Sequence, residues 1–242
     1  MNILLTGATS GIGLETLKSL LANKNKVYAV ARDFSKISNL LELHSDSLVP
    51  IKFDLKDTEN IEKIFNEINL VNEKLDAIIH CAGIEETIPL TLYSPAKIKN
   101  IYEVNVFAGI ELLRHFTKKK YSNDGASAVF VSSVMGVLGQ PGKIGYCSTK
   151  AAVLGMVKAS ALEFAKRKIR VNAVLPGVVN TPMTQNLFSQ ISAENVEEIK
   201  AMHPLGIGEV SDVVPSIEFL ISTNSRWITG QNFIIDGGYS IQ

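Results

Sequence analysis

The sequence has few of the residues that build disulfide-bonded or metal-dependent proteins. It contains two cysteines in 242 residues, Cys81 and Cys147, which are too few for a disulfide framework. Its four histidines show no metal-ligand spacing, so we expect no metal site. The low cysteine content favours a reducing compartment, and we expect the protein in the cytoplasm.

Long apolar runs are lacking as well. The N-terminal segment MNILLTGATSG has a four-residue apolar run, which is too short for a signal peptide. No segment approaches the roughly 20 apolar residues that a membrane-spanning helix needs. We therefore expect neither secretion nor insertion into a membrane.

Net charge is absent, because 24 basic residues balance 24 acidic ones. A nucleic-acid-binding protein would need a basic stripe with stacking aromatic side chains, and the sequence shows neither. The only basic cluster, KKK at 118–120, is typical of the solvated end of a helix before a loop. The sequence gives no indication of a polyanion partner.

What the sequence does contain is a regular alternation of short β-rich runs with longer amphipathic segments. Most of the short runs are continuously apolar, as in parallel strands that are covered on both faces. The alternation favours right-handed β-α-β crossovers, and it predicts a doubly wound α/β fold with a parallel sheet of about seven strands and helices on both faces. The expected strands are residues 2–6, 26–31, 48–53, 75–80, 127–132, 169–175 and 232–236.

The segment TGATSGIG, residues 6–13, lies between the first expected strand and the first expected helix. Glycines permit a tight turn and a close anion, while the helix N-terminus offers free N–H groups and a partial positive charge. This arrangement favours a dinucleotide, and the lack of a following Lys-Ser or Lys-Thr pair disfavours a phosphate-hydrolysing P-loop. The expected contacts in this loop are Gly7, Thr9, Ser10, Gly11, Ile12 and Gly13.

A tyrosine and a lysine in the segment GYCSTKAA form a candidate catalytic pair. Tyr146 and Lys150 are four residues apart on an expected helix, so their side chains share one face. A nearby ammonium group is expected to lower the pKa of the phenol from its usual value near 10, which would make the phenol a usable proton donor or base. YSPAK at 93–97 has the same spacing, but Pro95 suits a first helical turn and places Tyr93 outside the regular helix.

Together, the loop spacing T-G-x-x-x-G-x-G and the later Y-x-x-x-K resemble the fingerprint of the short-chain dehydrogenase/reductase family. The similarity runs from Thr6 to the terminal ITGQNFIIDGGYS, and the chain looks most similar to the 3-oxoacyl-[acyl-carrier-protein] reductases. The resemblance implies a single Rossmann-fold domain over residues 1–242 that binds NAD(P). It also implies that a serine thirteen residues before the tyrosine orients the substrate oxygen and that an asparagine supports a water-linked proton route. The implied catalytic set is Asn105, Ser133, Tyr146 and Lys150.

The resemblance implies cofactor contacts beyond the glycine loop. Cys81 replaces a family asparagine, and we interpret it as a small buried filler, with a redox switch as the alternative. Thr181 is positioned to bond the nicotinamide carboxamide or a phosphate oxygen. The implied contacts are Arg32, Asp54, Leu55, Cys81, Ala82, Gly83, Tyr146, Lys150, Pro176, Gly177, Val179 and Thr181.

Two adjacent residues at the end of the second expected strand give opposite indications about the cofactor. Asp33 lies twenty residues after Gly13, which by the general spacing rule indicates NAD. The family alignment instead places Arg32 just after the discriminating position, which is the NADP pattern. Because a guanidinium group binds phosphate through two parallel hydrogen bonds, we expect NADP(H) to be preferred, with NAD(H) as the alternative.

The resemblance implies hydride transfer between NADP(H) and a ketone or secondary alcohol, with Tyr146 as the proton donor. A 3-oxoacyl thioester is one candidate substrate, and a sugar-derived or other small-molecule ketone is the alternative. Arg167 matches a carrier-docking position beside the site, but Asp124 stands where another basic residue would be, and PLGIGEV at 204–210 lacks the usual arginine. A dinucleotide-sensing regulator is a second class of function, which the nearly intact catalytic set disfavours.

Residues 183–205 match the mobile lid that covers the substrate in this family. Within this segment, Met183, Leu187 and Phe188 either line an apolar pocket or pack the lid onto the body of the protein. The family assembles through the helix that carries the Tyr-x-x-x-Lys motif and through the C-terminal strand. We therefore expect a homotetramer or a homodimer.

Overall fold

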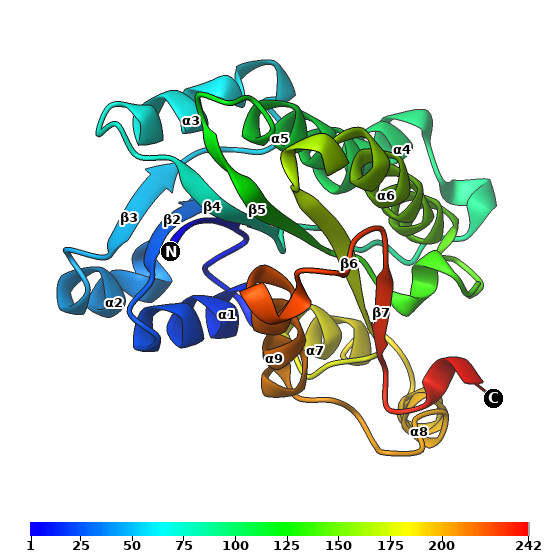
Figure 1. Cartoon of the computed structure of the whole chain (residues 1–242). Helices are drawn as coiled ribbons and strands as arrows, with labels where there is room; N and C mark the ends of the chain where they lie inside the picture. Colours follow the sequence, from blue (N-terminus) through cyan, green and yellow to red (C-terminus); the bar gives the residue numbers. More distant parts are fainter. Residues whose placement is uncertain (242) are drawn as a thin grey trace.

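The computed structural model describes residues 1–241 and contains one seven-stranded sheet. All neighbouring strands pair in parallel, in the order β3-β2-β1-β4-β5-β6-β7. The predicted doubly wound α/β fold is therefore confirmed (Figure 1). The strands are β1 (Asn2–Thr6), β2 (Lys26–Ala31), β3 (Leu48–Lys52), β4 (Leu75–His80), β5 (Ser122–Val131), β6 (Arg170–Pro176) and β7 (Asn232–Ile235).

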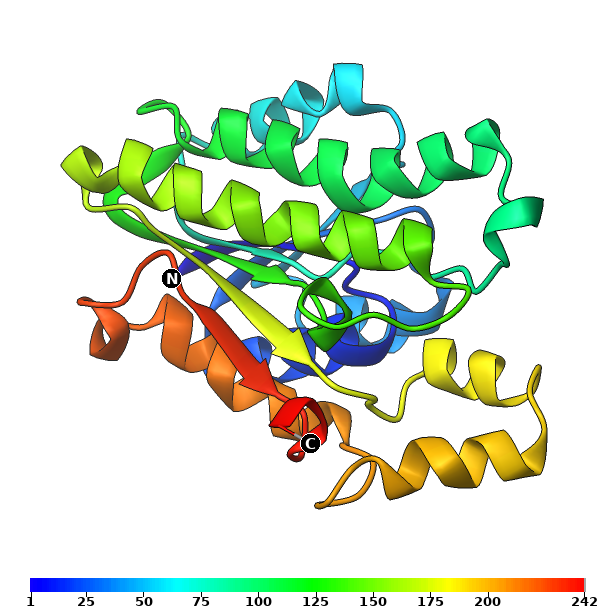
Figure 2. The same ribbon diagram turned by 90° about the vertical axis from the view of Figure 1, so that its right-hand side faces the viewer.

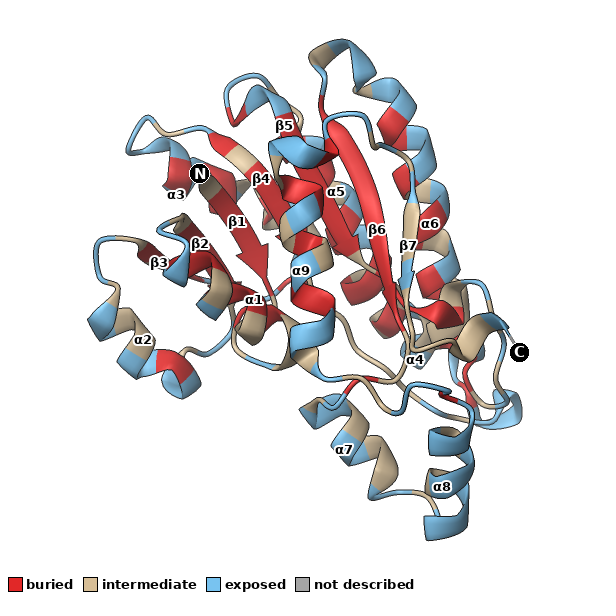
Figure 3. Cartoon of the chain, turned by 60° about the horizontal axis from the view of Figure 1, so that its bottom comes forward, coloured by how far each residue is buried: buried red, intermediate tan, exposed pale blue. Residues whose placement is uncertain are grey.

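Helices cover both faces of this sheet. One face packs against α3 (Glu62–Asn69), α5 (Ala108–Phe116) and α6 (Ile144–Glu163), with α4 (Pro95–Tyr102) beside α6. The other face packs against α1 (Gly11–Ala22) and α9 (Val210–Ile221), with α2 (Ser38–Leu43) next to β3. Figure 3 shows the buried strands between these two helical layers.

The apolar runs form strands because each strand contributes side chains to two hydrophobic cores, one on each face of the sheet. In β1, Ile3 and Leu5 belong to the core under α1 and α9, whereas Leu4 belongs to the core under α3, α5 and α6. Successive side chains of a strand point to opposite faces, so a strand that is covered on both sides is apolar at every position. All three of these residues are fully buried.

The structure corrects the predicted start of β5. The strand begins at Ser122 instead of residue 127, so the polar segment that was expected to be a loop lies within the strand. Leu75 pairs with Ser122 and Ala77 pairs with Ser127, which makes a β-bulge. Gly125 in this bulge has φ +82°, a left-handed conformation that glycine adopts without strain.

The basic cluster at 118–120 is largely solvated, as predicted, since Lys119 and Lys120 are exposed. It follows the end of α5, but two of its ammonium groups reach α3. The Nζ atoms of Lys118 and Lys120 lie 3.3 Å and 3.4 Å from Oε1 of Glu62. The cluster therefore links α3 to the α5–β5 connection.

Two short helices, α7 (Pro182–Phe188) and α8 (Ala193–Ala201), extend beyond the carboxyl ends of β6 and β7 (Figure 2). Neither helix contains a buried residue. Over residues 1–241, no helix combines the length and the apolarity needed to cross a bilayer. Because all seven strands are parallel, the loops that follow them meet at one edge of the sheet, next to α7 and α8.

Candidate active site

A cavity of about 680 Å³ lies along the carboxyl edge of the sheet. Loops after β1, β2, β3, β4, β5 and β6 contribute to its wall, together with α6 and the α7–α8 segment. Of the predicted site residues, only Asn105 does not line it. Those that line it are Gly7, Thr9, Ser10, Gly11, Ile12, Gly13, Arg32, Asp54, Leu55, Cys81, Ala82, Gly83, Ser133, Tyr146, Lys150, Pro176, Gly177, Val179 and Thr181.

The glycine turn between β1 and α1 has no room for side chains. Gly7 has φ +71°, and a Cβ atom there would lie 2.8 Å from the backbone nitrogen of Ala82. A Cβ atom on Gly13 would lie 2.2 Å from the carbonyl oxygen of Gly7. Ser10 is the N-cap of α1, but its side chain makes no capping hydrogen bond. The turn therefore offers backbone N–H groups and a helix N-terminus to the cavity, which fits the diphosphate of a dinucleotide.

The side chains of Arg32 and Asp33 differ in their hydrogen bonds and in their position relative to the cavity. The Asp33 carboxylate accepts hydrogen bonds from the Ser35 hydroxyl at 2.6 Å and from the Ser35 backbone N–H at 3.1 Å. These bonds hold the pKa of Asp33 below its usual value, and its side chain does not line the cavity. Arg32 does line the cavity and is exposed, and it has no hydrogen bond or ion pair within residues 1–241.

Tyr146 and Lys150 lie in the first half of α6, on the side that faces the cavity. The Lys150 ammonium group donates a hydrogen bond to the Val131 carbonyl at the end of β5 (2.9 Å) and lies 5.5 Å from the centre of the Tyr146 ring. Lys150 is 6% exposed. The helix thus brings an ammonium group and a phenol to the same wall of the cavity.

The pKa values of this pair correct one prediction. Burial raises the pKa of Tyr146 to about 12, and hydrogen bonding with Ser133 only partly opposes this effect. Burial also lowers the pKa of Lys150 to about 8. The predicted lowering of the Tyr146 pKa by Lys150 is not seen, because loss of solvation raises this pKa and the charge on Glu85 raises it further.

Ser133 follows β5 and caps a short 3₁₀ turn, Val134–Gly136, by accepting a hydrogen bond from the Met135 N–H (3.2 Å). Its neighbour Ser132, which sequence reasoning missed, donates a hydrogen bond to the Lys150 carbonyl (3.0 Å). The end of β5 is therefore fixed against α6 by two hydrogen bonds, from Ser132 to the Lys150 carbonyl and from the Lys150 ammonium group to the Val131 carbonyl.

Asn105 lies in a π-helical turn, Glu103–Phe107, between α4 and α5. Its side-chain oxygen accepts from the Ile84 N–H at 2.8 Å, and its amide nitrogen donates to the Ile84 carbonyl at 2.9 Å and to the Thr149 hydroxyl at 3.1 Å. A Cβ atom on Gly83 would lie 3.4 Å from the Asn105 oxygen and 3.5 Å from the Lys150 nitrogen. Asn105 is thus behind the wall of the cavity, where it joins the loop after β4 to α6.

His80 ends β4 and Cys81 follows it, behind the glycine turn. Nδ1 of His80 lies 2.8 Å from the Thr6 hydroxyl, which links β4 to β1, and burial lowers the His80 pKa to about 3. Burial raises the pKa of the Cys81 thiol to about 12. Because oxidation requires thiolate character, these surroundings favour the interpretation of Cys81 as a packing residue.

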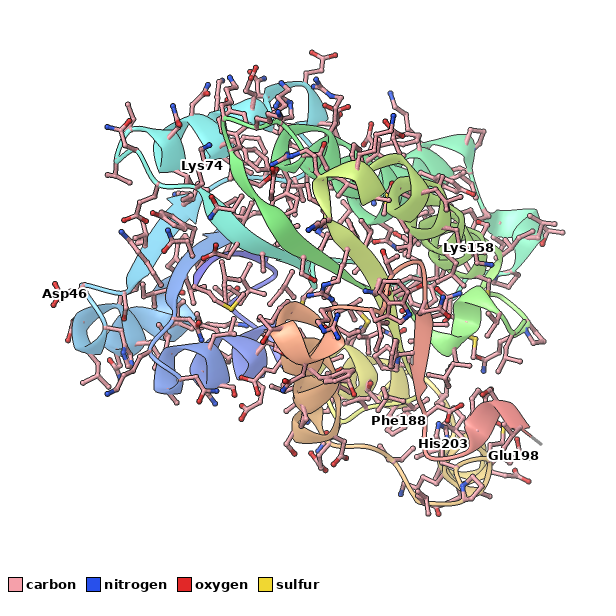
Figure 4. All side chains as sticks on the ribbon, viewed as in Figure 1. Asp46, Lys74, Lys158, Phe188, Glu198 and His203 are labelled. Carbon is pink, nitrogen blue, oxygen red and sulfur yellow. The ribbon has the colours of Figure 1, made fainter. Side chains whose placement is uncertain are left out.

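The α7–α8 segment forms the remaining wall of the cavity. Met183 and Leu187 line it, as the pocket interpretation predicts, whereas Phe188 does not. Thr181 caps α7, because its hydroxyl oxygen accepts from the Thr184 N–H (3.2 Å). Figure 4 labels Phe188, the last residue of α7, and His203, which follows α8.

A buried ion pair beside Tyr146 was also missed by sequence reasoning. Nζ of Lys143 lies 3.0 Å from Oε1 of Glu85, and the two side chains are 7% and 12% exposed. A signal was present for the lysine, because Lys143 precedes Tyr146 by three residues and so lies near it on a helical surface. The glutamate follows a different strand, so the pairing itself is a tertiary contact.

Comparisons with known proteins agree with this geometry. A family model described as enoyl-(acyl carrier protein) reductase matches residues 7–240. The chain is 33% identical to the 3-oxoacyl-[acyl-carrier-protein] reductase FabG of Thermotoga maritima, over 98% of this chain and 97% of that protein. Its structure is similar to that of a 4-hydroxyisoleucine dehydrogenase mutant complexed with NADH and succinate, with 32% identity, a TM-score of 0.93 and coverage of 100% of this chain and 99% of that one.

A second solved structure, ElxO with NADP bound, is 31% identical with a TM-score of 0.87 and covers 100% of this chain and 99% of its own. The similarity in sequence and structure extends over nearly the whole chain, as the two motifs predict. The chain belongs to the short-chain dehydrogenase/reductase family.

Proposed function

We propose that the protein is an NADP(H)-dependent oxidoreductase that interconverts a ketone and a secondary alcohol by hydride transfer. The observation that carries this proposal is the convergence of Ser133, Tyr146 and Lys150 with the glycine turn in one cavity. The nicotinamide, when bound, supplies or accepts the hydride. The residues of the chain bind the cofactor, orient the substrate and move the proton.

Tyr146 is the proposed proton donor to the carbonyl oxygen. With a pKa of about 12 its phenol is protonated near neutral pH, as reduction requires. Ser133 positions the carbonyl by donating a hydrogen bond to its oxygen. Lys150 stabilises the tyrosinate that forms, and Asn105 positions the loop after β4 beside it. In the oxidative direction the same groups act in reverse.

The preference for NADP(H) is supported by Arg32. Its guanidinium group lines the cavity after β2 without a partner in residues 1–241, whereas Asp33 is held by Ser35. A phosphate on the ribose would give Arg32 a bidentate partner. An acid that accepts from the ribose hydroxyls would favour NAD(H), and the engaged Asp33 does not fill that role.

The substrate is either a carrier-bound 3-oxoacyl thioester or a small-molecule ketone. FabG of Thermotoga maritima is named for the former. In this chain, however, the guanidinium group of Arg167 donates to Asp124 at 2.7 Å, to the Thr117 carbonyl at 2.6 Å and to the Ser122 carbonyl at 2.9 Å. Arg167 also precedes β6, at the opposite end of the sheet from the cavity, so the predicted place beside the site was wrong. Because the Arg167 donors already have partners within the chain, they are not free to bind a carrier protein. This favours a small-molecule ketone as the substrate.

The test is the oxidation of NADPH with an acetoacetyl thioester and a panel of small ketones, for wild type and Tyr146→Phe. We expect turnover by wild type and a fall in kcat of about 10²- to 10⁴-fold in the variant, with NADPH binding retained. Tyr102→Phe is the matched control, because the Tyr102 hydroxyl has no hydrogen bond within residues 1–241. Full turnover by Tyr146→Phe would contradict the proposal, and tight NADPH binding without turnover of any ketone would favour the dinucleotide-sensing regulator.

We further propose one domain over residues 1–242 in which residues 183–205 act as a lid. The support is that α7 and α8 wall the cavity without burying a residue of their own. Limited proteolysis within this segment should slow when NADPH and substrate are added. Cleavage at an unchanged rate would argue against a lid.

Assembly as a homodimer or homotetramer is supported by exposed apolar side chains near the end of α6 and before β7. Leu162 is 82% exposed and Trp227 is 91% exposed. Light scattering that shows a monomer at micromolar concentration would exclude this assembly. The two free cysteines, Cys81 and Cys147, suit the cytoplasmic location that we propose.

A further inference from the structure

Tyr146 lies beside two ammonium groups, and the proposed proton transfer uses only one of them. The Lys150 nitrogen lies 5.5 Å from the centre of the Tyr146 ring, and the Lys143 nitrogen lies 5.8 Å from it. Both lysines are buried and line the cavity, and Lys143 comes directly before the first residue of α6. An ammonium group at such a distance stabilises the ionised form of a phenol, so both lysines bear on how easily Tyr146 gives up its proton.

A carboxylate opposes one of these two cations. Oε1 of Glu85 lies 3.0 Å from Nζ of Lys143, and the two side chains are 12% and 7% exposed. The Thr87 hydroxyl donates a hydrogen bond to the same oxygen at 2.6 Å, which fixes the carboxylate on the loop after β4. Lys150 has no ion pair within residues 1–241 and donates to the Val131 carbonyl. The charge of Lys143 is therefore compensated beside the phenol, whereas that of Lys150 is not.

The groups next to Tyr146 show what this compensation acts on. Burial raises the pKa of Tyr146 to about 12 against the hydrogen bond with Ser133, and the charges of Glu85 and Cys147 raise it further. Glu86, the other acid on the loop after β4, is directed to Tyr93. Burial and then the charge and hydrogen bond of Glu86 raise the pKa of Tyr93. Glu85 is thus the carboxylate whose charge reaches Tyr146.

The remaining titratable groups of the cavity have other partners or lie at the cofactor end. Both ring nitrogens of His203 are hydrogen-bonded to the backbone, and its ring stacks on that of Tyr239 at 4.6 Å. Behind the glycine turn, burial lowers the pKa of His80 to about 3 and raises that of Cys81 to about 12, so both are neutral near pH 7. The other charged lining residues follow β2 and β3: Arg32, Asp54 and Lys56.

Resting on the proposed function, we propose that Glu85 is a positioning residue of the proton transfer: its carboxylate opposes the Lys143 charge, and the pair sets how strongly the Tyr146 phenol holds the proton that it donates. Lys150 remains as the cation that stabilises the tyrosinate after the proton has left. In this role Glu85 acts through its charge and needs no contact with the substrate. The role accounts for an ion pair that is buried in the cavity wall, although its burial costs the desolvation of two charges.

The direct test is the titration of Tyr146 in the full-length protein. 3-Fluorotyrosine is incorporated at position 146 and followed by ¹⁹F NMR, because fluorine makes the phenol more acidic and brings its titration to a pH at which the protein is folded. Glu85→Gln should lower the pKa of this phenol by about 1, and Lys143→Met should raise it by about 1. Both variants break the same ion pair, so a merely structural role would not move the pKa in opposite directions.

Glu73→Gln is the matched control, because Glu73 pairs with Lys26 at 2.7 Å beside Tyr28 and precedes β4, at the end of the sheet opposite to the cavity. It breaks a comparable ion pair and should leave the Tyr146 titration as in wild type. The variant with both substitutions in the cavity should titrate between the two single variants. Melting temperatures near that of wild type show that the variants are folded, and Lys143→Gln replaces the methionine variant if that one unfolds.

The kinetic counterpart is the pH profile of kcat/KM for the oxidation of 2-pentanol with NADP⁺, which rises as the phenol ionises. Its midpoint should move in the same two directions. Shifts of one sign in both single variants, a titration that matches wild type, or opposite NMR shifts that leave the profile of an active enzyme unmoved would each overturn the inference while the proposed function stands. If no alcohol is oxidised, opposite shifts in the NMR titration support the action of Glu85 on Tyr146 although the proposed reaction fails, and an unmoved titration overturns it.

Discussion

The cofactor end and the substrate end of the cavity are built from different parts of the protein. At the glycine turn the wall is backbone, with so little space that a Cβ atom on Gly13 would lie 2.2 Å from a carbonyl oxygen. At the other end the wall is made of side chains, among them Glu86, Lys143 and Leu187. Helix α1 buries five of its residues, whereas α7 and α8 bury none. Substitutions at the cofactor end should therefore lower stability as well as cofactor binding, whereas substitutions at the substrate end should alter substrate binding with little loss of stability.

The largest difference in stability should be the one between alanine substitutions at two glycines, Gly13 and Gly155. We expect Gly13→Ala to destabilise the protein by about 3 kcal/mol or more and to abolish NADPH binding, because the added methyl group has no place. Gly155→Ala, on the exposed side of α6, should stabilise by about 0.5–1 kcal/mol, since its Cβ position meets no atom within 4 Å beyond the adjacent residues and the backbone of its own helix. Urea unfolding and fluorescence titration with NADPH measure both effects. Wild-type affinity in Gly13→Ala would show that the turn is not rigid.

Two leucines, one in the core under α1 and one in the wall of the cavity, should separate stability from substrate binding. Leu17 in α1 is fully buried, so Leu17→Ala should cost about 2–5 kcal/mol. Leu187→Ala in α7 should change stability by less than about 0.5 kcal/mol while it raises KM for the ketone. Thermal unfolding and steady-state kinetics of the two variants check this. A large loss of stability in Leu187→Ala would mean that the α7–α8 segment is part of the core.

Lys150 should make stability depend on pH. Its folded pKa of about 8 lies below the value of 10.5 for an unfolded chain, so the unfolded state binds more protons between these values. Stability should therefore rise with pH in this window, and the penalty of burying the ammonium group should be fully present below pH 8. Relative to Lys150→Met, wild type should gain about 2 kcal/mol between pH 7.5 and 9.5 in urea unfolding. Parallel pH profiles would show that the lysine is not desolvated.

An effect confined to cofactor binding should appear at Arg32, on the exposed rim of the cofactor end. Arg32→Ala should weaken NADPH binding about ten- to a hundredfold and leave NADH binding almost unchanged, because only NADPH has the extra phosphate. Dissociation constants for both cofactors measure the difference. Similar constants for NADPH and NADH in wild type, unaltered in the variant, would remove the preference for NADP(H).

The cofactor end could be predicted from the sequence because its chemistry follows the chain. A strand, a glycine turn and a helix are consecutive, so the spacing of Gly7, Gly11 and Gly13 alone indicates their place. Tyr146 and Lys150 were predictable for the same reason, since both belong to one helix. Strands β1, β2 and β4 have the predicted bounds, and each is built around a short run of apolar residues.

The substrate end was not predictable, because its contacts join distant segments. The pairing of Lys143 with Glu85 depends on how the loop after β4 packs against α6. A contact of this kind leaves no periodic pattern in the sequence. The sign of the Tyr146 pKa shift depends on burial, which spacing does not show. The early start of β5 depends on a bulge that only its pairing with β4 reveals.

The π-helical turn at Glu103–Phe107 has a consequence for how this chain tolerates insertions. One residue added to an ordinary α-helix rotates everything after it by about 100°, which would turn the buried face of α5 away from the sheet. A π turn confines such an addition to a single loop of the helix. Helix α5 therefore keeps Leu112 and Phe116 in the core while Asn105 faces Ile84 and Thr149. Deleting one residue here would leave a continuous α-helix, in which the direction of Asn105 fixes the direction of the α5 side chains. Either Asn105 would then turn away from Ile84 and Thr149, or Leu112 and Phe116 would turn out of the core.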